Sequence, residues 1–304
     1  MPAERLIIGC GYLGRRVAER WRLAGDHVTV LTRSEDRAAR LKQEGLQPLV
    51  GDVLDPGSLK HLPTVATVLL SVGFDRSGGA DFRTVTVGGM RNLLASPAGQ
   101  SDRILSISST SVYGQHEGEL VDETSPTEPD RPNGAACLEA EQLLTRTRAE
   151  FAQQNHSPLW TVVLRLAGIY GPGRMLRRLD QLRSQEPLSG KAEAWLNLIH
   201  VDDAARAVCA AAERPQPAPL YLVADDAPVQ RRDFYETLSH LTGSPPPVFD
   251  EDAASEGSRP RSAGLGKRCD NRRLRAELLD ALEYPTWQEG LRQAVQELRE
   301  QNGQ

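Results

Sequence analysis

Three glycines near the start of the chain constrain its fold more than any other feature. They lie in the pattern Gly9-Cys10-Gly11-Tyr12-Leu13-Gly14. The apolar run at 5–9 predicts a short buried strand before the glycines, and apolar positions at helical spacing over 13–24 predict a helix after them. A strand, a glycine-rich turn and a helix in this order are typical of the first unit of a dinucleotide-binding α/β sheet.

Each glycine has its own physical role in such a turn. Gly9 allows the tight turn, Gly11 lets a pyrophosphate approach the backbone, and Gly14 lets the helix pack closely on the strand. The free N–H groups at the start of the helix attract the phosphates. The alternative is a glycine turn without a ligand. The residues predicted to bind the dinucleotide here are Gly9, Gly11, Tyr12, Leu13, Gly14 and, at the end of a later strand, Ser71.

Strand and helix patterns alternate through the rest of the first half of the chain. Further strands are predicted at 27–32, 48–50, 67–72, 103–108 and 160–166, and further helices at 36–43, 85–95 and 135–153. This alternation predicts an α/β fold of the Rossmann type, with a doubly wound parallel sheet. A last amphipathic helix is predicted at 287–301.

The regularity loosens in the later part of the chain. A length of 304 residues indicates either one large α/β domain with a smaller lobe or two domains. We predict a Rossmann domain over residues 1–172, and residues 195–225 are predicted to belong to the same domain. The segments 173–194 and 226–304 are expected to form a smaller C-terminal substrate lobe.

The residues after the second predicted strand indicate which dinucleotide binds. An acidic residue about 20 positions beyond the glycines would accept both ribose hydroxyls of NAD. The sequence has Arg33 and Ser34 there, which favours the 2′-phosphate of NADP, although Asp36 close by keeps NAD open. Asp52 and Val53 follow the third predicted strand, where the Asp either receives the adenine amino group or belongs to a simple turn.

Composition and charge argue against several classes of function. The formal net charge of -5, from 36 basic and 41 acidic residues, argues against nucleic acid as a main partner. No apolar run reaches the ~18 residues of a spanning helix, and the apolar run at the start is too short for a signal peptide. The four cysteines are dispersed, and the six histidines do not have the spacing of metal ligands. The sequence therefore predicts neither disulfides nor a metal site. We expect a cytoplasmic protein with a small-molecule ligand, no membrane partner, and a homodimer as one compatible state.

Four further motifs run along the chain. They are Ser-Ile-Ser-Ser-Thr-Ser-Val-Tyr-Gly at 106–114, Gly-Gly-Met-Arg-Asn-Leu-Leu at 88–94, Leu-Arg-Leu-Ala-Gly-Ile-Tyr-Gly-Pro-Gly-Arg at 164–174, and Ile-His-Val-Asp-Asp-Ala at 199–204. Together they resemble the extended short-chain dehydrogenases/reductases, in the NAD-dependent epimerase/dehydratase family. Within that family the chain is most similar to the atypical YeeZ-like group. The resemblance implies hydride transfer to or from a nicotinamide cofactor.

The family's catalytic set is a Ser or Thr, a Tyr, and a Lys four residues after the Tyr. The resemblance assigns the Ser to Ser109, the Tyr position to Asn133 and the Lys position to Cys137, in a register that Glu141 supports. An Asn amide does not titrate near neutral pH, and losing a positioned acid or base costs about 10²–10⁴-fold in rate. Cys137 is either a thiolate or a structural thiol, and the structural role is favoured because no adjacent Lys or His would lower its pKa.

The resemblance also implies a substrate cleft. The residues at family cleft positions are Thr110, Arg165, Arg174, Asn197 and His200. Arginines there would bind a phosphate or carboxylate, but Arg165 could equally form a salt bridge at a strand end. His200 as a base is the less favoured reading, because Asp202 and Asp203 after it begin the next helix.

Two functions follow from these observations. The first is an NADP-linked oxidoreductase or epimerase that acts on a polar, sugar-like metabolite with Ser109 and an unusual proton donor. The second is a non-catalytic NADP-binding sensor or regulatory protein. The glycine turn supports both, Ser109 favours the first, and the missing Tyr and Lys favour the second.

Overall fold

The computed structural model describes residues 2–74, 79–96, 101–153, 159–174, 176–251, 264–301 and 303. They form two compact units, and each unit is assembled from separate stretches of the chain. The first unit consists of Met1–Tyr113, Thr127–Arg165 and Ala205–Tyr221. The second unit consists of Gly114–Pro126, Leu166–Ala204 and Leu222–Gln304.

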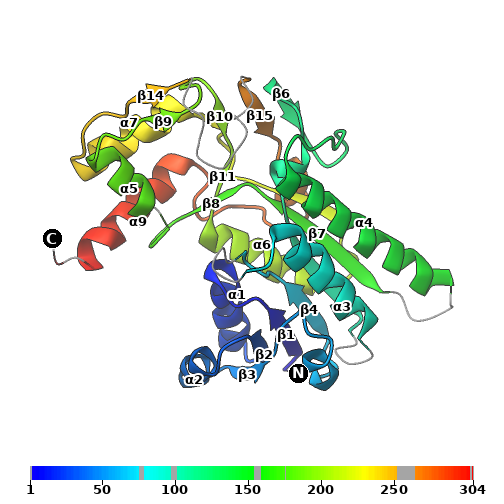
Figure 1. Ribbon diagram of the computed structural model, residues 1–304. Helices are drawn as coiled ribbons and strands as arrows, with labels where there is room; N and C mark the ends of the chain where they lie inside the picture. The colour runs from blue at the N-terminus through cyan, green and yellow to red at the C-terminus, as the bar shows by residue number, and fades with distance from the viewer. Residues whose placement is uncertain are drawn as a thin grey trace. The chain divides into compact units, whose positions relative to one another are not determined.

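A seven-stranded sheet, most of which belongs to the first unit, has the strand order β12-β7-β5-β4-β1-β2-β3 (Figure 1). Each pairing from β3 through β2, β1 and β4 to β5 is parallel. The order reverses at β1, with β2 and β3 on one side and β4 on the other, as in Rossmann sheets. The predicted doubly wound α/β fold is therefore confirmed. The strands are β1 (Glu4–Ile8), β2 (His27–Thr32), β3 (Gln47–Val50), β4 (Thr67–Leu70), β5 (Arg103–Ser109), β7 (Trp160–Leu166) and β12 (Leu220–Val223).

The helices between these strands follow the sequence prediction closely. One difference is that the helix predicted at 85–95 begins with a π-helical segment, which a periodicity near 3.6 residues does not distinguish from an α-helix. The helical segments are α1 (Tyr12–Leu23), α2 (Glu35–Gln43), η1 (Ser58–His61), η2 (Thr84–Gly88), α3 (Gly89–Ala95), η3 (Thr110–Val112) and α4 (Pro132–Gln153). Helix α6 (Val201–Glu213) crosses from the second unit into the first.

The core of the first unit comes from apolar side chains at the periodicity of each element. In α4, Ala136, Ala140 and Leu144 recur every four residues, so they share one face, and all three are buried against strand side chains. Leu6 and Ile8 of β1 belong to the same buried cluster. This packing fixes α4 against the sheet and thereby places Cys137 and Glu141, which α4 also carries.

The second unit contains short strands that pair in twos. They are β8 (Gly168–Tyr170) with β11 (Leu198–His200), β6 (Glu117–Val121) with β15 (Gly266–Cys269), β9 (Leu188–Ser189) with β14 (Phe249–Asp250), and β10 (Trp195–Leu196) with β13 (Val229–Gln230). Its other helices are α5 (Leu176–Arg183), α7 (Arg231–Thr242), α8 (Arg272–Glu277) and α9 (Trp287–Gln301). The predicted helix at 287–301 is thus confirmed as α9.

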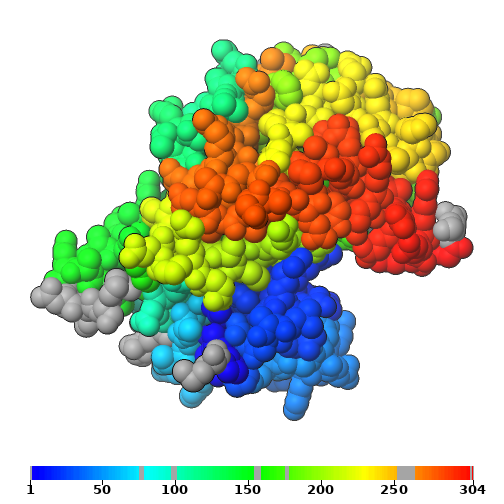
Figure 2. Space-filling model, turned by 180° about the vertical axis from the view of Figure 1, so that it is seen from behind, coloured from blue at the N-terminus to red at the C-terminus, as the bar shows by residue number. Residues whose placement is uncertain are grey.

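Helices α7 and α9 enclose an apolar core of the second unit. Phe234 and Leu238 of α7 are buried against Trp287 and Leu291 of α9. Figure 2 shows the end of α7 and the segment from 264 to 301, in yellow to red, as one continuous surface. No helix within the described part of the chain combines the length and the apolar character needed to cross a membrane.

Candidate functional site

The glycine turn has the geometry that its sequence predicts. Gly9 adopts a φ of 95°, and a Cβ atom there would lie 2.5 Å from the carbonyl oxygen of Ser71. A Cβ on Gly14 would lie 2.5 Å from the carbonyl oxygen of Gly9. A Cβ on Gly11 would meet nothing within 4 Å. The turn is therefore closed toward the sheet and open on the side where a ligand would approach.

The N-terminus of α1 faces this open side without a side-chain cap. Gly11 is the N-cap residue, and no side chain caps the first N–H groups of the helix. Such groups are free to donate hydrogen bonds to an anion, and the helix dipole favours negative charge there. The first turn of α1 can therefore hold a pyrophosphate.

A cleft with about 1260 Å³ of open space lies beside the turn. Residues that follow the carboxyl ends of β1, β2, β3 and β4 form its walls, which is where α/β sheets bind ligands. The lining consists of Ile8, Gly9, Cys10, Gly11, Leu31, Thr32, Arg33, Arg37, Gly51, Asp52, Val53, Leu54, Val72, Gly73, Phe74, Ala80 and Val85. Of the predicted cofactor residues, Gly9, Gly11, Arg33, Asp52 and Val53 are among them.

Two arginines stand at the end of the cleft beyond β2. Arg33 is exposed and follows the strand directly, and Arg37 comes from the first turn of α2. The Nη2 atom of Arg37 donates a hydrogen bond of 2.6 Å to the carbonyl oxygen of Cys10, which ties α2 to the glycine turn. Arg37 was not predicted from the sequence, although its spacing of four residues from Arg33 at a helix start was the available signal.

Four predicted cofactor residues support the site from outside the lining of the cleft. The Ser34 hydroxyl caps α2 by accepting a 3.3 Å hydrogen bond from the Arg37 N–H. The Ser71 hydroxyl donates to the carbonyl oxygen of Gly9 over 2.6 Å. Leu13 is buried, and the ring of Tyr12 lies under the guanidinium of Arg16. These contacts shape the turn, and direct contact of the four residues with a dinucleotide stays a prediction.

Asp52 has the turn role that was one of its two predicted roles, and its contact with the adenine amino group stays a prediction. Its Oδ1 atom accepts a 2.9 Å hydrogen bond from the Leu54 N–H, as in a turn, and the residue also lines the cleft. The Ser58 hydroxyl holds the same segment by donating to the Asp52 carbonyl oxygen over 2.9 Å.

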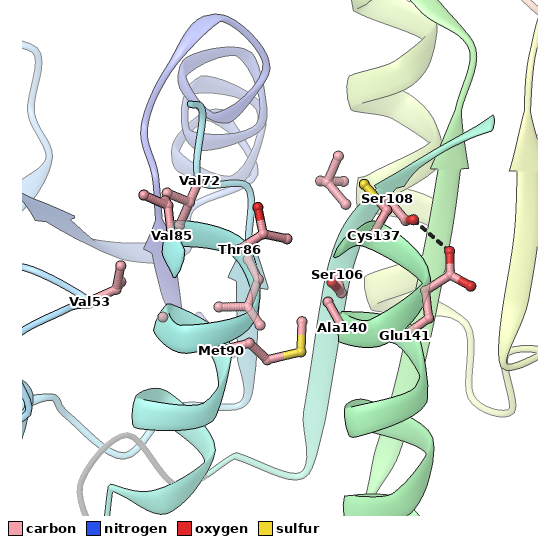
Figure 3. Close-up of a pocket in the computed structure, with 13 residues that line it drawn as sticks. Val53, Val72, Val85, Thr86, Met90, Ser106, Ser108, Cys137, Ala140 and Glu141 are labelled. Atoms are coloured by element: carbon pink, nitrogen blue, oxygen red, sulfur yellow. Dashed lines mark hydrogen bonds between the residues drawn. The ribbon is translucent and has the colours of Figure 1, made fainter. Parts of the chain in front are cut away.

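A second cavity, with about 500 Å³ of empty volume, lies between α3 and α4 (Figure 3). It shares Val53, Val72 and Val85 with the cleft. Thr86 and Met90 approach it from one helix, and Cys137, Ala140 and Glu141 approach it from the other (Figure 3). Ser106 and Ser108 of β5 add hydroxyl groups. The cavity therefore extends the cleft toward the residues that the sequence assigned to catalysis.

A buried polar network closes one wall of the second cavity. The Ser108 hydroxyl donates to Oε1 of Glu141 over 2.5 Å (Figure 3). Arg165 donates to both carboxylate oxygens of Glu141, and its Nη1 atom donates to the Tyr113 hydroxyl over 2.9 Å. Burial lowers the pKa of Arg165, but Glu141 and Tyr113 together raise it above its usual value, so the guanidinium stays charged. Arg165 thus forms the salt bridge that was the alternative to its predicted contact with substrate.

Cys137 is a protonated thiol in this environment. Burial, the largest cause, and the Glu141 carboxylate raise its pKa to about 11, against the opposing effect of hydrogen bonds with Ser108 and Ser111. A thiol with this pKa is neither a nucleophile nor a base near neutral pH. The structure therefore favours a structural role for Cys137 over the thiolate.

Of the other two residues assigned to catalysis, Asn133 lies where α4 begins and Ser109 lies at the end of β5. Asn133 is exposed in the first turn of α4, and a Cβ on the next residue, Gly134, would lie 2.3 Å from the Ser111 carbonyl oxygen. Ser109 accepts a hydrogen bond of 3.1 Å from the Ser111 N–H, and Thr110 is buried beside it. The α4 N-terminus thus packs directly on the segment that carries Ser109, and the assigned register stays a prediction.

The predicted substrate residues of the second unit make internal contacts. The Asn197 amide donates to the Lys267 carbonyl oxygen over 2.8 Å and accepts from the Cys269 N–H over 2.6 Å. His200 is fully buried, with Nε2 at 3.2 Å from Oε1 of Gln293. Arg174 is exposed. The contacts of Asn197 and His200 are structural, so a ligand role for either would require these hydrogen bonds to break.

The family follows from a comparison of the whole sequence with known families. The profile of the NAD dependent epimerase/dehydratase family matches residues 6–224. The chain belongs to this family. The matched residues include the glycine turn, Asp52, the Ser109 segment and Arg165.

Individual relatives agree with the family assignment. The chain is 29% identical over 287 residues to Protein YeeZ of Escherichia coli (strain K12), which covers 92% of this chain and 95% of that protein. It is 28% identical over 247 residues to a 4-hydroxy-2-methyl-3-oxo-4-farnesyl-3,4-dihydroquinoline-1-oxide ketoreductase of Stigmatella aurantiaca, covering 77% and 72% of the two chains. The solved structure of MoeE5 in complex with UDP-glucose and NAD has the same fold, with a TM-score of 0.78 and 21% identity over 98% of this chain and 99% of that one.

That Asn133 and Cys137 stand at the positions of the family's usual proton-transfer pair stays a prediction. Asn133 and Cys137 are one helical turn apart on α4, as the Tyr and Lys would be. Neither side chain can exchange a proton near neutral pH. Among the described residues, no group of three or more His, Cys, Asp or Glu side chains could hold a metal ion.

Proposed function

We propose that this protein binds NADP in the cleft beside the glycine turn and uses it as an oxidoreductase or epimerase on a small, polar, sugar-like metabolite. NAD is the weaker ligand in this proposal. The observation that carries it is the pair of Arg33 and Arg37 at the end of the cleft. The bound cofactor would supply hydride transfer at its nicotinamide ring.

The charges at the end of β2 support the preference for NADP. A carboxylate at this position would repel a 2′-phosphate, whereas an arginine binds it through charge-assisted hydrogen bonds. The residues that line the described cleft there are Thr32 and Arg33, neither of them acidic. Asp36, which kept NAD open in the sequence, lies outside the lining.

The residues of this chain have separate tasks in the proposed reaction. The first turn of α1 holds the pyrophosphate, and Ser109 orients the reacting oxygen of the substrate. Proton transfer must come from a group other than Asn133 or Cys137, such as the substrate itself or a water molecule. The ketoreductase among the relatives and the sugar nucleotide bound to MoeE5 support carbonyl or hydroxyl chemistry on a small molecule.

A second candidate function is a sensor that binds NADP without turnover. The raised pKa of Cys137 favours it, because the position that the resemblance assigns to the family's Lys here carries a neutral thiol. Such a protein would change its oligomeric state or its partner when it binds the cofactor.

Calorimetric titration with NADP and NAD tests the cofactor preference. We expect Arg33→Ala to weaken NADP binding about 10- to 100-fold, because hydrogen bonds to charged groups contribute about 1.5–3 kcal/mol, and to change NAD binding little. Arg40→Ala is the matched control, since Arg40 is exposed on α2, the helix that follows Arg33, and lies outside the cleft. Equal losses for both cofactors would contradict the preference.

A turnover assay separates the two candidate functions. Wild-type protein is incubated with NADPH, or with NADP, and a mixture of sugars, sugar nucleotides and ketones, while cofactor absorbance and the composition of the mixture are followed. A change in absorbance or an isomerised component supports the enzyme. Tight NADP binding without any change, together with a cofactor-dependent shift in oligomeric state, supports the sensor.

We also propose a cytoplasmic location and a homodimeric state. The four cysteines are free thiols, which suits a reducing compartment. Light scattering of the purified protein, with and without NADP, measures the oligomeric state directly.

A further inference from the structure

We propose that the ring of Phe74 stacks on the adenine of the bound dinucleotide. Phe74 is then a binding residue for the adenosine half of the cofactor. This inference rests on the proposed function, because it assumes that a dinucleotide occupies the cleft.

Phe74 presents an apolar ring to the cleft where solvent would otherwise cover it. The residue follows β4 and lines the cleft, and 38% of its surface is exposed. Exposed phenylalanine rings are unfavourable in water, so a ligand that covers the ring gains binding free energy. Val53, Leu54 and Val85 give the same cleft further apolar walls.

The ring of Phe74 is held by a second aromatic side chain. Its centroid lies 5.6 Å from that of Phe82, with an angle of 72° between the ring planes, which is an edge-to-face contact. Phe82 in turn packs against the buried core of the first unit. A ring that is already oriented loses less side-chain entropy when a ligand packs against it.

The two cavities indicate which half of the dinucleotide Phe74 meets. The second cavity, which Ser108 and Cys137 line, is on the side expected for the nicotinamide, and Phe74 does not line it. Phe74 lines the same cleft as Arg33 and Asp52, the two residues predicted to contact the adenosine half of the cofactor. The flat ring within its reach is therefore the adenine.

Adenine has the chemistry that this end of the cleft recognises. It offers two flat faces for an aromatic ring, and such stacking contributes strongly to binding of nucleobases. Its amino group can donate a hydrogen bond to the carboxylate of Asp52, which lines the same cleft. Phe74 would add affinity through its ring, and Asp52 would add specificity for the base.

Titration with the two halves of the cofactor tests the stacking. We expect Phe74→Ala to weaken binding of ADP, NAD and NADP by a common factor of about 5- to 150-fold, the range of base–aromatic stacking. Binding of nicotinamide mononucleotide should stay within about 2-fold of wild type. Phe151→Ala is the matched control, because Phe151 is 39% exposed on α4 of the same unit and lies outside the cleft.

A second variant keeps the test informative if Phe74→Ala disturbs the loop. Phe74→Trp should retain ADP affinity, and its fluorescence above the wild-type background should be quenched when ADP stacks on the indole. Unchanged ADP affinity in Phe74→Ala, or a loss confined to nicotinamide mononucleotide, would overturn the inference while leaving the proposed function intact. If the wild type bound neither NAD nor NADP, the proposed function would fail, and the stacking with it.

Discussion

Arg165 and Glu141 form an ion pair in which Nη2 lies 2.6 Å from Oε2 and both side chains are more than nine-tenths buried. The pair joins β7 to α4, and through Ser108 it also holds the end of β5. Two of these three elements carry residues assigned to catalysis. The ion pair therefore fixes the wall of the second cavity, whatever chemistry takes place beside it.

Removing one partner of this pair should destabilise the protein strongly. Glu141→Leu leaves the Arg165 charge buried, and such losses cost about 3–5 kcal/mol. The double variant Glu141→Leu with Arg165→Met leaves no buried charge and should recover most of that loss. Urea unfolding of the wild type, Glu141→Leu, Arg165→Met and the double variant measures both effects. A double variant that is less stable than either single variant would contradict this account.

The glycine turn yields a prediction that separates folding from binding. Gly9→Ala places a Cβ 2.5 Å from the Ser71 carbonyl oxygen at a φ of 95°, so it should destabilise the fold by more than about 1 kcal/mol. Gly11→Ala meets nothing within 4 Å and should keep the stability of the wild type. We still expect the Gly11 variant to lose dinucleotide affinity, because its methyl group would occupy space that the pyrophosphate needs in order to approach the backbone. Urea unfolding and calorimetry on both variants check this, and full NADP affinity in Gly11→Ala would contradict it.

Local patterns explain how much of the first unit could be predicted. The turn at Gly9 and helix α1 follow from residues within one short stretch, and β2 and β7 were predicted with the bounds that the structure has. Strands of two or three residues, such as β10 and β13, contain too few side chains to show a period, so most of the second unit could not be predicted.

The candidate site was predictable to the extent that its residues lie in motifs. Arg33 and Asp52 follow strands at expected positions, whereas Phe74 lies in a loop without a sequence signal. The partner of Arg165 is 24 residues away and is set by the packing of α4 on the sheet. His200 was assigned by resemblance alone, and its burial depends on rings that come from distant parts of the second unit, such as that of Tyr284.

Asp225 makes the stability of the second unit depend on pH. It is 1% exposed, and its Oδ2 atom has no hydrogen-bond partner in the described part of the chain. Burial raises the pKa of Asp225 well above its usual range, the Ala227 N–H opposes the shift, and the carboxylates of Asp226 and Asp203 add to it. The folded protein thus keeps a proton that the unfolded chain releases above about pH 4.

The sign of the pH effect follows from this proton. The stability that protonated Asp225 contributes is complete below about pH 4 and is lost as the pH rises through the raised pKa. Asp225→Asn keeps the shape and cannot ionise, so its gain in stability over the wild type should grow with pH. Urea midpoints measured between about pH 4 and about pH 8 check the trend. Parallel pH profiles for the two proteins would show that Asp225 is ionised in the fold.

Restoring the family's proton-transfer pair tests whether the rest of the catalytic machinery is intact. Cys137 lines the second cavity, so the longer side chain of Cys137→Lys has space to extend there, within reach of the Glu141 carboxylate. Asn133→Tyr places a phenol one turn earlier on the exposed start of α4, beside the segment that carries Ser109. A positioned acid or base is worth about 10²–10⁴-fold in rate, so the double variant should turn over NADP with some component of the metabolite mixture faster than the wild type.

Asn133→Phe with Cys137→Met is the matched control, because it fills similar space without a titratable group. If the double variant binds NADP and remains as inactive as this control, then the protein has lost more of the family's chemistry than its proton relay, and the sensor becomes the better account of its function.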